Sequence, residues 1–173
     1  MKIRDWILLL LMVGVLGVWI WSRVLLPDFH HEPFTKIEER LYSGMKVPQP
    51  PPGTTVVVNV CGAKNEYPVK ISHWRPIMDA GDPPKLPWLR EIVQFVDTKM
   101  KEGETVFIHC AAGISRSGLV TTAYIMRKYN WSRDRALEYV RDRRPQIKPI
   151  QACMKLLLEW ESEIKSAQAS DGR

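Results

Sequence analysis

Cysteine is scarce in this chain, which has only Cys61, Cys110 and Cys153 among its 173 residues. A small, odd number of cysteines excludes a disulfide scaffold. No CxxC pair or His/Cys cluster is present, which argues against a structural zinc site. The sequence also lacks internal repeats and a stripe of basic residues. Its net charge of +6 is mild, so neither a repeat protein nor a nucleic-acid-binding protein is indicated.

Long hydrophobic runs are absent except for one, residues 6–21 (WILLLLMVGVLGVWIW). Extended past Arg23, this run reaches the ~20 residues needed to span a bilayer. Lys2 and Arg4 also suit a cleaved signal peptide, but no small-x-small cleavage site follows. A buried core helix is the least favoured interpretation, because the run has no polar face. We therefore predict a transmembrane anchor over residues 1–26.

The remaining chain is long enough for one domain. We predict a linker over residues 27–33, a globular domain over 34–166 and a flexible tail over 167–173. Without residues 1–23, which carry three basic residues and one acidic residue, the net charge is near +4. That charge fits an anionic substrate or a membrane surface, and equally a solvated surface of mixed charge.

Strand and helix patterns alternate along the domain. The β-branched run 54–60 (TTVVVNV) predicts a buried strand, and the proline run 47–53 predicts a stiff connection rather than a partner ligand. Further predicted strands are 36–44, 67–78 and 105–108, and predicted helices are 88–101, 119–129, 131–143 and 150–165. This alternation predicts an α/β fold with a sheet covered on both faces.

The segment 107–118 (FIHCAAGISRSG) carries the chemistry. Small residues between Cys110 and Arg116 let backbone N–H groups converge on one point, as in phosphate-binding loops. A thiol with an ordinary pKa of ~8.5 is mostly protonated at neutral pH, but aligned amides, a helix N-terminus and one cation favour the thiolate. The planar guanidinium of Arg116 can hold two phosphate oxygens.

This segment resembles the Cys-x5-Arg signature loop of the cysteine-dependent protein phosphatases, specifically the dual-specificity type. KIEERLYSG, VVVNVCG and PIMDAG resemble the family's opening strand, next buried strand and acid loop. The C-terminal helices are also similar, so that the resemblance covers roughly residues 34–165. It implies a central, mostly parallel sheet flanked by helices.

The resemblance also implies a mechanism that needs no metal or cofactor. Cys110 attacks phosphorus and forms a phosphocysteine, which water then hydrolyses. Ser117 donates to the departing sulfur, and His109 orients the cysteine. The phosphate is bound by Arg116 and by the backbone of Ala111, Ala112, Gly113, Ile114 and Ser115.

An aspartate in the loop PIMDAGD would act as general acid and then as base. Asp79 matches the family's position and is favoured over Asp82, which suits a turn beside Gly81. The loop contains about one residue more than the family's pattern.

The chain differs from the family's pattern at two points. Many relatives have an asparagine directly after the proline that corresponds to Pro149, but this chain has Ile150 there. It therefore lacks a side chain that would support the signature loop. The usual helix between the first two strands is replaced by the proline run.

Cys61 has two interpretations. It can be a small packing residue at the end of a core strand. In some related inositol-lipid phosphatases a cysteine at this position forms a disulfide with the nucleophile, so Cys61 is also a candidate redox partner of Cys110. Cys153 is predicted to be a packing residue.

Three functions fit the sequence. The first is a membrane-anchored phosphatase acting on phosphotyrosine, and also on phosphoserine or phosphothreonine, in proteins. The second is a lipid or inositol-phosphate phosphatase, although residues 111–115 lack the basic residues typical of lipid-directed relatives, which favours singly phosphorylated substrates. The third is a non-catalytic phosphopeptide-binding module, which would usually have lost the cysteine, arginine or acid.

Charges around the anchor give opposing topology signals. Lys2 and Arg4 favour a cytoplasmic N-terminus, whereas Arg23, Lys36 and Arg40 favour a cytoplasmic domain. A reactive thiolate works best in a reducing compartment, so we predict a single-pass membrane protein with a cytoplasmic catalytic domain.

Overall fold

The computed structural model describes residues 12, 32–64, 66–78 and 84–171. The chain divides into two units, and the second, Glu32–Arg173, holds all the strands and helices discussed below. Nearly all of the predicted anchor and linker lie outside the described residues. Within the described part of the chain, no helix has the length and apolar character required to cross a bilayer.

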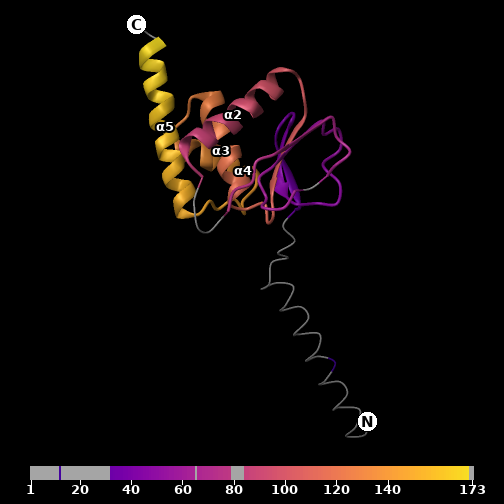
Figure 1. The fold of residues 1–173 in the computed structure, drawn as a ribbon. Helices are drawn as coiled ribbons and strands as arrows, with labels where there is room; N and C mark the ends of the chain where they lie inside the picture. Colours follow the sequence, from indigo (N-terminus) through magenta and orange to yellow (C-terminus); the bar gives the residue numbers. More distant parts are fainter. Residues whose placement is uncertain (1–11, 13–31, 65, 79–83, 172–173) are drawn as a thin grey trace, which may run out of the picture. The chain divides into compact units, whose positions relative to one another are not determined.

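The described residues of this unit form five strands and four helices (Figure 1). The strands are β1 (Phe34–Glu38), β2 (Leu41–Met45), β3 (Val56–Asn59), β4 (Ile71–Trp74) and β5 (Val106–Cys110). The helices are α2 (Leu86–Lys101), α3 (Arg116–Tyr129), α4 (Arg133–Arg143) and α5 (Gln151–Asp171).

The strands form one sheet in the order β1-β2-β5-β3-β4. Only the β1–β2 pair is antiparallel, and the other three pairs are parallel. This confirms the predicted mostly parallel sheet. Because β5 lies at its centre, between β2 and β3, the C-terminal end of β5 is flanked by two other strand ends.

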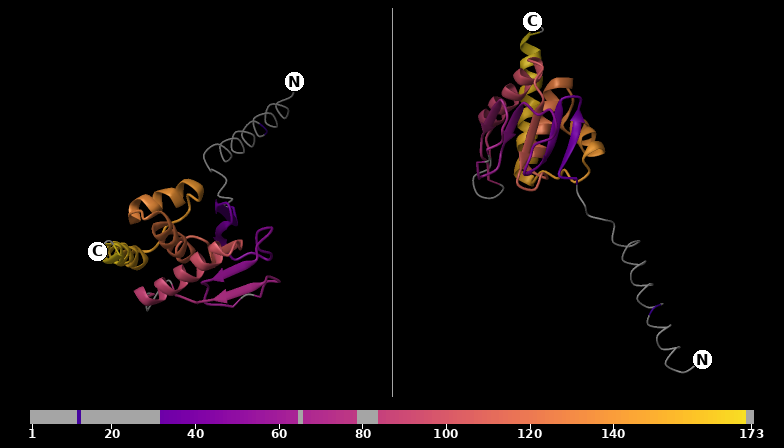
Figure 2. Two further views of the ribbon diagram at one scale, coloured as in Figure 1. Left: turned by 90° about the horizontal axis from the view of Figure 1, so that it is seen from above. Right: turned by 90° about the vertical axis from the view of Figure 1, so that its right-hand side faces the viewer.

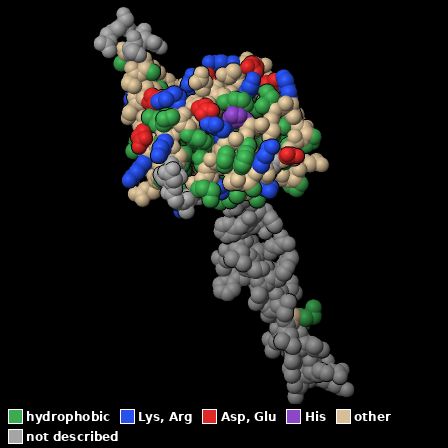
Figure 3. All heavy atoms as spheres, viewed as in Figure 1, with side chains coloured by type: hydrophobic (Ala, Val, Ile, Leu, Met, Phe, Trp, Pro, Cys, Tyr) green, Lys and Arg blue, Asp and Glu red, His purple; other side chains and the backbone are tan. Residues whose placement is uncertain are grey.

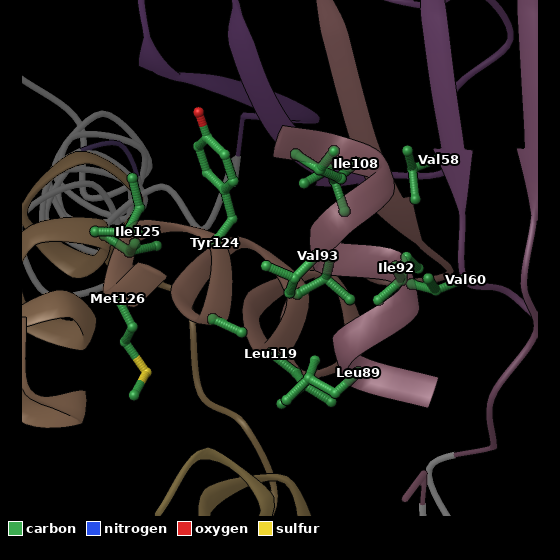
Figure 4. Packing of buried hydrophobic residues seen from close by; sticks show 14 of the residues in the cluster. Val58, Val60, Leu89, Ile92, Val93, Ile108, Leu119, Tyr124, Ile125 and Met126 are labelled. Carbon is green, nitrogen blue, oxygen red and sulfur yellow. The ribbon is translucent and has the colours of Figure 1, made fainter. Parts of the chain in front are cut away.

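The central strands β3 and β5 are buried on both faces of the sheet, as predicted, whereas the edge strands β1 and β4 are partly exposed. The described helices cover only one face (Figure 2). Alternate residues of β3 face opposite sides, since Val56 and Val58 belong to the cluster shared with the helices and Val57 belongs to a smaller one. Figure 4 shows side chains of α2 and α3, among them Ile92, Val93 and Leu119, packed beside strand residues. The smaller cluster comprises strand and loop residues, with Val47, Val57, Tyr67 and Phe107 at its centre.

The predicted first strand, residues 36–44, is wrong as a single element. The chain turns at Glu39 and Arg40, so that β1 and β2 form a hairpin with Glu38 paired to Leu41. This turn lets both Ile37 and Leu41 be buried, at 2% and 0% exposure. The period-2 pattern does not reveal such a reversal, because the residues on either side of it also suit a strand.

The other elements agree with prediction apart from their ends. Ser132 is the N-cap of α4, and its hydroxyl accepts a hydrogen bond from the N–H of Arg135 at 3.4 Å. Helix α5 continues to Asp171, so residues 167–171, predicted as a flexible tail, are helical. As expected from the proline run, residues 46–55 between β2 and β3 contain no helix.

Candidate active site

The signature loop lies between the C-terminal end of β5 and the N-terminus of α3. Cys110 is the last residue of β5 and is 2% exposed, and Arg116 is the first residue of α3. Met45, at the end of β2, pairs with Cys110. The sheet thus fixes the sulfur-bearing residue, and the helix places its positive end at the loop.

The carbonyl groups of the loop are held by donors outside it. The Ala111 carbonyl accepts from the N–H of Lys46 at 3.3 Å, and the Ile114 carbonyl accepts from the N–H of Lys148 at 3.1 Å. The Gly113 carbonyl accepts from Nε of Arg144 at 3.1 Å. In a trans peptide the C=O of one residue and the N–H of the next point in opposite directions. The N–H groups of Ala112, Ile114 and Ser115, which belong to these three peptides, therefore face away from the outside donors.

The Cys110 sulfur has two polar neighbours in the loop and helix. The N–H of Gly113 donates to Sγ at 3.2 Å, and the hydroxyl oxygen of Ser117 lies 3.4 Å from Sγ. Gly113 adopts a φ of +67°, and a Cβ there would collide with backbone atoms of Gly44 and Met45. Glycine is therefore required at this position on grounds of both conformation and space.

Arg116 connects the loop with the segment before residues 79–83. Its side chain is half-buried, and Nη1 donates to the carbonyl of Ile77 at 3.3 Å. Asp79 and Asp82, the two candidates for the acid, lie outside the described residues. Their assignment stays a prediction, but the segment that leads to them is bonded to the arginine of the loop.

The side chain of His109 is fully buried on the face of the sheet opposite the helices. Its ring stacks on Phe107 and meets Tyr67 edge-on, with centroids 5.3 and 5.6 Å away. Burial lowers the pKa of His109 to about 4, assisted by the charge of Lys46, while a hydrogen bond with the Cys110 backbone acts in the opposite direction. At neutral pH the imidazole is therefore uncharged, so His109 contributes packing and a backbone contact rather than a cation.

Cys61 lies next to His109, the residue that precedes Cys110. Its sulfur is 3.6 Å from Nδ1 of His109, and its N–H donates to the side chain of Asn59 at 2.7 Å. Burial, together with the negative charge of a Cys110 thiolate, raises the pKa of Cys61 to about 11. All three cysteines are free. The packing interpretation accounts for these contacts, and the redox interpretation stays a prediction.

Backbone groups at and near position 150, where an asparagine was expected from the resemblance, support the signature loop. The N–H of Ile150 donates to the hydroxyl of Ser115 at 3.2 Å, and the neighbouring Lys148 N–H bonds the Ile114 carbonyl. The same Ser115 hydroxyl donates to the sulfur of Cys153, with 4.0 Å between the oxygen and the sulfur. The loop is thus tied to the start of α5 despite this departure from the family's pattern.

One residue at the site was not predicted from the sequence. Arg144 follows α4, is fully buried and bonds the signature loop at Gly113. The only sequence signal is the pair Arg143–Arg144, and local periodicity does not tell which of the two points inwards.

Comparisons with known proteins agree with this geometry. The model of a protein family described as dual specificity phosphatase, catalytic domain, matches residues 51–163. Human dual specificity protein phosphatase 8 is 40% identical over 97 residues, which cover 56% of this chain and 16% of the relative. The chain therefore spans well under two thirds of that relative's length.

Two solved structures share the fold. A crystal structure of a mouse putative dual specificity phosphatase complexed with zinc tungstate has a TM-score of 0.73 and 25% identity. That match covers 82% of this chain and 94% of the other. A crystal structure of PTPMT1 in complex with PI(5)P has a TM-score of 0.66 and 22% identity, with 79% and 99% covered. At that identity the second likeness shows the fold alone.

Proposed function

We propose a function for this chain from one premise: it belongs to the dual specificity phosphatase family, whose catalytic-domain model matches residues 51–163. The chain hydrolyses phosphomonoesters of protein side chains, with phosphotyrosine as the favoured substrate. The observation that carries this proposal is the arrangement around Cys110. Its sulfur accepts from the Gly113 N–H, in a loop whose carbonyls are bonded to outside donors.

In the first step, Sγ of Cys110 attacks phosphorus in line and the ester oxygen leaves, protonated by Asp79. The inward-facing amides of the loop and the guanidinium of Arg116 stabilise the charge on the equatorial oxygens. Such preorganised donors act most strongly at a site from which water is excluded.

In the second step, water attacks the phosphocysteine and releases inorganic phosphate. The carboxylate of Asp79 accepts a proton from that water. The hydroxyl of Ser117, 3.4 Å from the sulfur, stabilises the departing thiolate by a hydrogen bond.

Substrate class follows from the charge of the loop. Residues 111–115 (AAGIS) contain no basic side chain, so the loop matches the charge of one phosphate group. Phosphoserine and phosphothreonine peptides are further candidates, and a phosphoinositide is the alternative that a membrane location would favour.

The location is part of the proposal. Residues 1–26 anchor the protein in a membrane as a single-pass helix, and the catalytic unit faces the cytoplasm. The support is the hydrophobic run of residues 6–21 and the need for a reduced thiol.

Turnover by purified protein tests the proposed function. We expect hydrolysis of a phosphotyrosyl peptide by the wild type and no turnover by Cys110→Ser, because a serine hydroxyl is not ionised at neutral pH. Phosphoseryl peptides and phosphoinositide vesicles are assayed in parallel to rank the substrate classes.

Arg116→Lys is compared with Arg143→Lys as its control. Arg143 is exposed, stacks on Tyr139 and lies outside the loop. A lysine keeps the charge but not the planar fork, so only the first variant should lose activity. Full activity of Cys110→Ser would refute the proposed mechanism, and faster hydrolysis of phosphoinositide than of phosphopeptide would replace the proposed substrate.

A further inference from the structure

Arg144 is a buried cation whose hydrogen bonds within the described part of the chain reach neutral groups. Its guanidinium donates to the carbonyl of Gly113 at 3.1 Å, the carbonyl of Glu32 at 2.9 Å and the hydroxyl of Thr35 at 3.0 Å. Over residues 32–64, 66–78 and 84–171, no carboxylate forms an ion pair with it. A buried charge without an ionic partner is costly, and that cost calls for a compensating interaction.

Cys110 can provide that interaction when it is ionised. Burial lowers the pKa of Arg144, and the negative charge of Cys110 raises it more than that of Glu32 does. Among the described residues, Cys110 in its anionic form is therefore the group whose charge most favours this guanidinium.

The hydrogen bond at Gly113 also fixes part of the loop. It holds the carbonyl of the Gly113–Ile114 peptide outwards, so that the Ile114 N–H points to the opposite side, where substrate phosphate would bind. The N–H of Gly113 itself donates to Sγ of Cys110. Gly113 is therefore held between the arginine and the sulfur.

Other charged or titratable groups surround Cys110 and must be considered. Arg116 lies on α3, Cys61 follows β3, Lys46 follows β2, and His109 precedes the cysteine on β5. Lys46 is exposed, His109 is uncharged at neutral pH, and Arg116 is half-buried. Arg144 differs from these groups because it is a permanent charge that is fully buried.

We propose that Arg144 is a positioning residue of the reaction, which holds the Gly113–Ile114 peptide in its phosphate-binding orientation and supplies a second positive charge behind the Cys110 thiolate. This role rests on the proposed function. It extends the phosphate-binding machinery beyond the signature loop to the end of α4, and to the first residues of the compact unit through Glu32 and Thr35.

The test compares Arg144→Gln, Arg144→Lys and the control Arg143→Gln in the full chain. The pH dependence of Cys110 alkylation by iodoacetamide is followed by mass spectrometry, and kcat and KM are measured with an aryl phosphate. We expect the half-maximal pH of alkylation to rise by about one pH unit in Arg144→Gln, because an opposite charge nearby is lost. Arg144→Lys should stay near the wild type, and Arg143→Gln should match it.

A merely structural role predicts a different result. It would lower the thermal stability of Arg144→Gln and Arg144→Lys alike and leave the half-maximal pH unchanged in both, which would overturn the proposal. A half-maximal pH in the wild type no lower than that of free cysteine would instead refute the proposed function. The two failures are therefore distinguishable.

Thr35→Val keeps the guanidinium and tests the same contacts if Arg144→Gln does not fold. Valine has nearly the shape of threonine but cannot accept the bond from Nη1. Tungstate, a tetrahedral oxyanion like phosphate, is the probe, and its affinity is measured by calorimetry. We expect this affinity to fall about fivefold, because one hydrogen bond that positions the arginine is lost. An unchanged affinity would overturn the proposal.

Discussion

Gly113 and Gly53 are two glycines with the same backbone conformation and different surroundings. Their φ angles are +67° and +77°, but a Cβ on Gly113 would meet Gly44, Met45 and Arg144, whereas nothing lies within 4 Å of a Cβ on Gly53. Conformational strain is therefore similar at both sites, and crowding is confined to Gly113.

We predict that Gly53→Ala costs about 1 kcal/mol of stability, from backbone strain alone. Gly113→Ala should cost clearly more and should also lower kcat/KM, because the loop must shift to admit the methyl group. Urea unfolding and an aryl phosphate assay measure both effects. Equal losses of stability in the two variants would contradict the crowding at Gly113.

His109 makes the stability of the fold depend on pH. Its pKa is lowered from 6.5 to about 4, so the unfolded chain binds more protons between these values. The contribution of His109 to the free energy of unfolding is fully present above about pH 6.5 and is lost as the pH falls towards 4. A pKa shift of this size corresponds to about 3 kcal/mol of that free energy.

The matched variant is His109→Gln, compared with the wild type by urea unfolding at pH 7 and pH 4.5. We expect the wild type to lose more stability than the variant between these two values. The pKa of His73 is also lowered, mainly by burial, and it is present in both proteins, so the difference isolates His109. Parallel pH profiles would show that His109 is protonated at no cost in the folded state.

At the scale of elements, the segment that leads from β4 to α2 supplies the acid in the proposed mechanism. Its described part includes Ile77, whose carbonyl is bonded by Arg116. This contact keeps the start of the loop at the arginine, as the proposed proton donor requires.

We predict that Asp79→Ala lowers kcat about 10²–10⁴-fold, with little change in KM, because a general acid contributes that much. Asp82→Ala, in the same loop and with the same loss of charge, is the control and should be nearly as active as the wild type. Both are assayed with phosphotyrosyl peptide. A larger loss in Asp82→Ala would transfer the acid role to Asp82.

At the scale of the whole molecule, the charges of the catalytic unit are mixed. Lys and Arg side chains alternate with Asp and Glu over the face shown in Figure 3, so no stripe of one sign covers that face. Several of the ion pairs join exposed groups, such as Lys64–Glu66 and Arg75–Glu91. Membrane binding through this face would be weak and sensitive to salt.

We therefore predict that membrane binding depends on residues 1–26. The full chain should sediment with neutral phosphatidylcholine vesicles and resist release by about 1 M salt, because hydrophobic insertion is not screened. A fragment of residues 32–173, the compact unit, should stay in the supernatant. Sedimentation of both proteins, or release of the full chain by salt, would contradict the anchor.

The sequence by itself predicted several central secondary-structure elements of the molecule. The β-branched run at β3, the helical spacing in α2 and the N-cap Ser132 are local signals that depend on only a few neighbouring residues, and each predicted its element. The sequence also predicted that the loop from Cys110 to Arg116 joins a strand to a helix, because its small residues permit a tight path between the two elements.

Only the tertiary structure decided which distant groups meet at that loop. It divided one predicted strand into the β1–β2 hairpin, put the described helices on one face of the sheet, and bonded the Ile150 N–H to the loop at Ser115. It also turned Arg144 inwards while Arg143 stayed exposed. These outcomes depend on contacts between residues far apart in the chain, and the free energy of burying a charge is set by all its neighbours together rather than by local sequence.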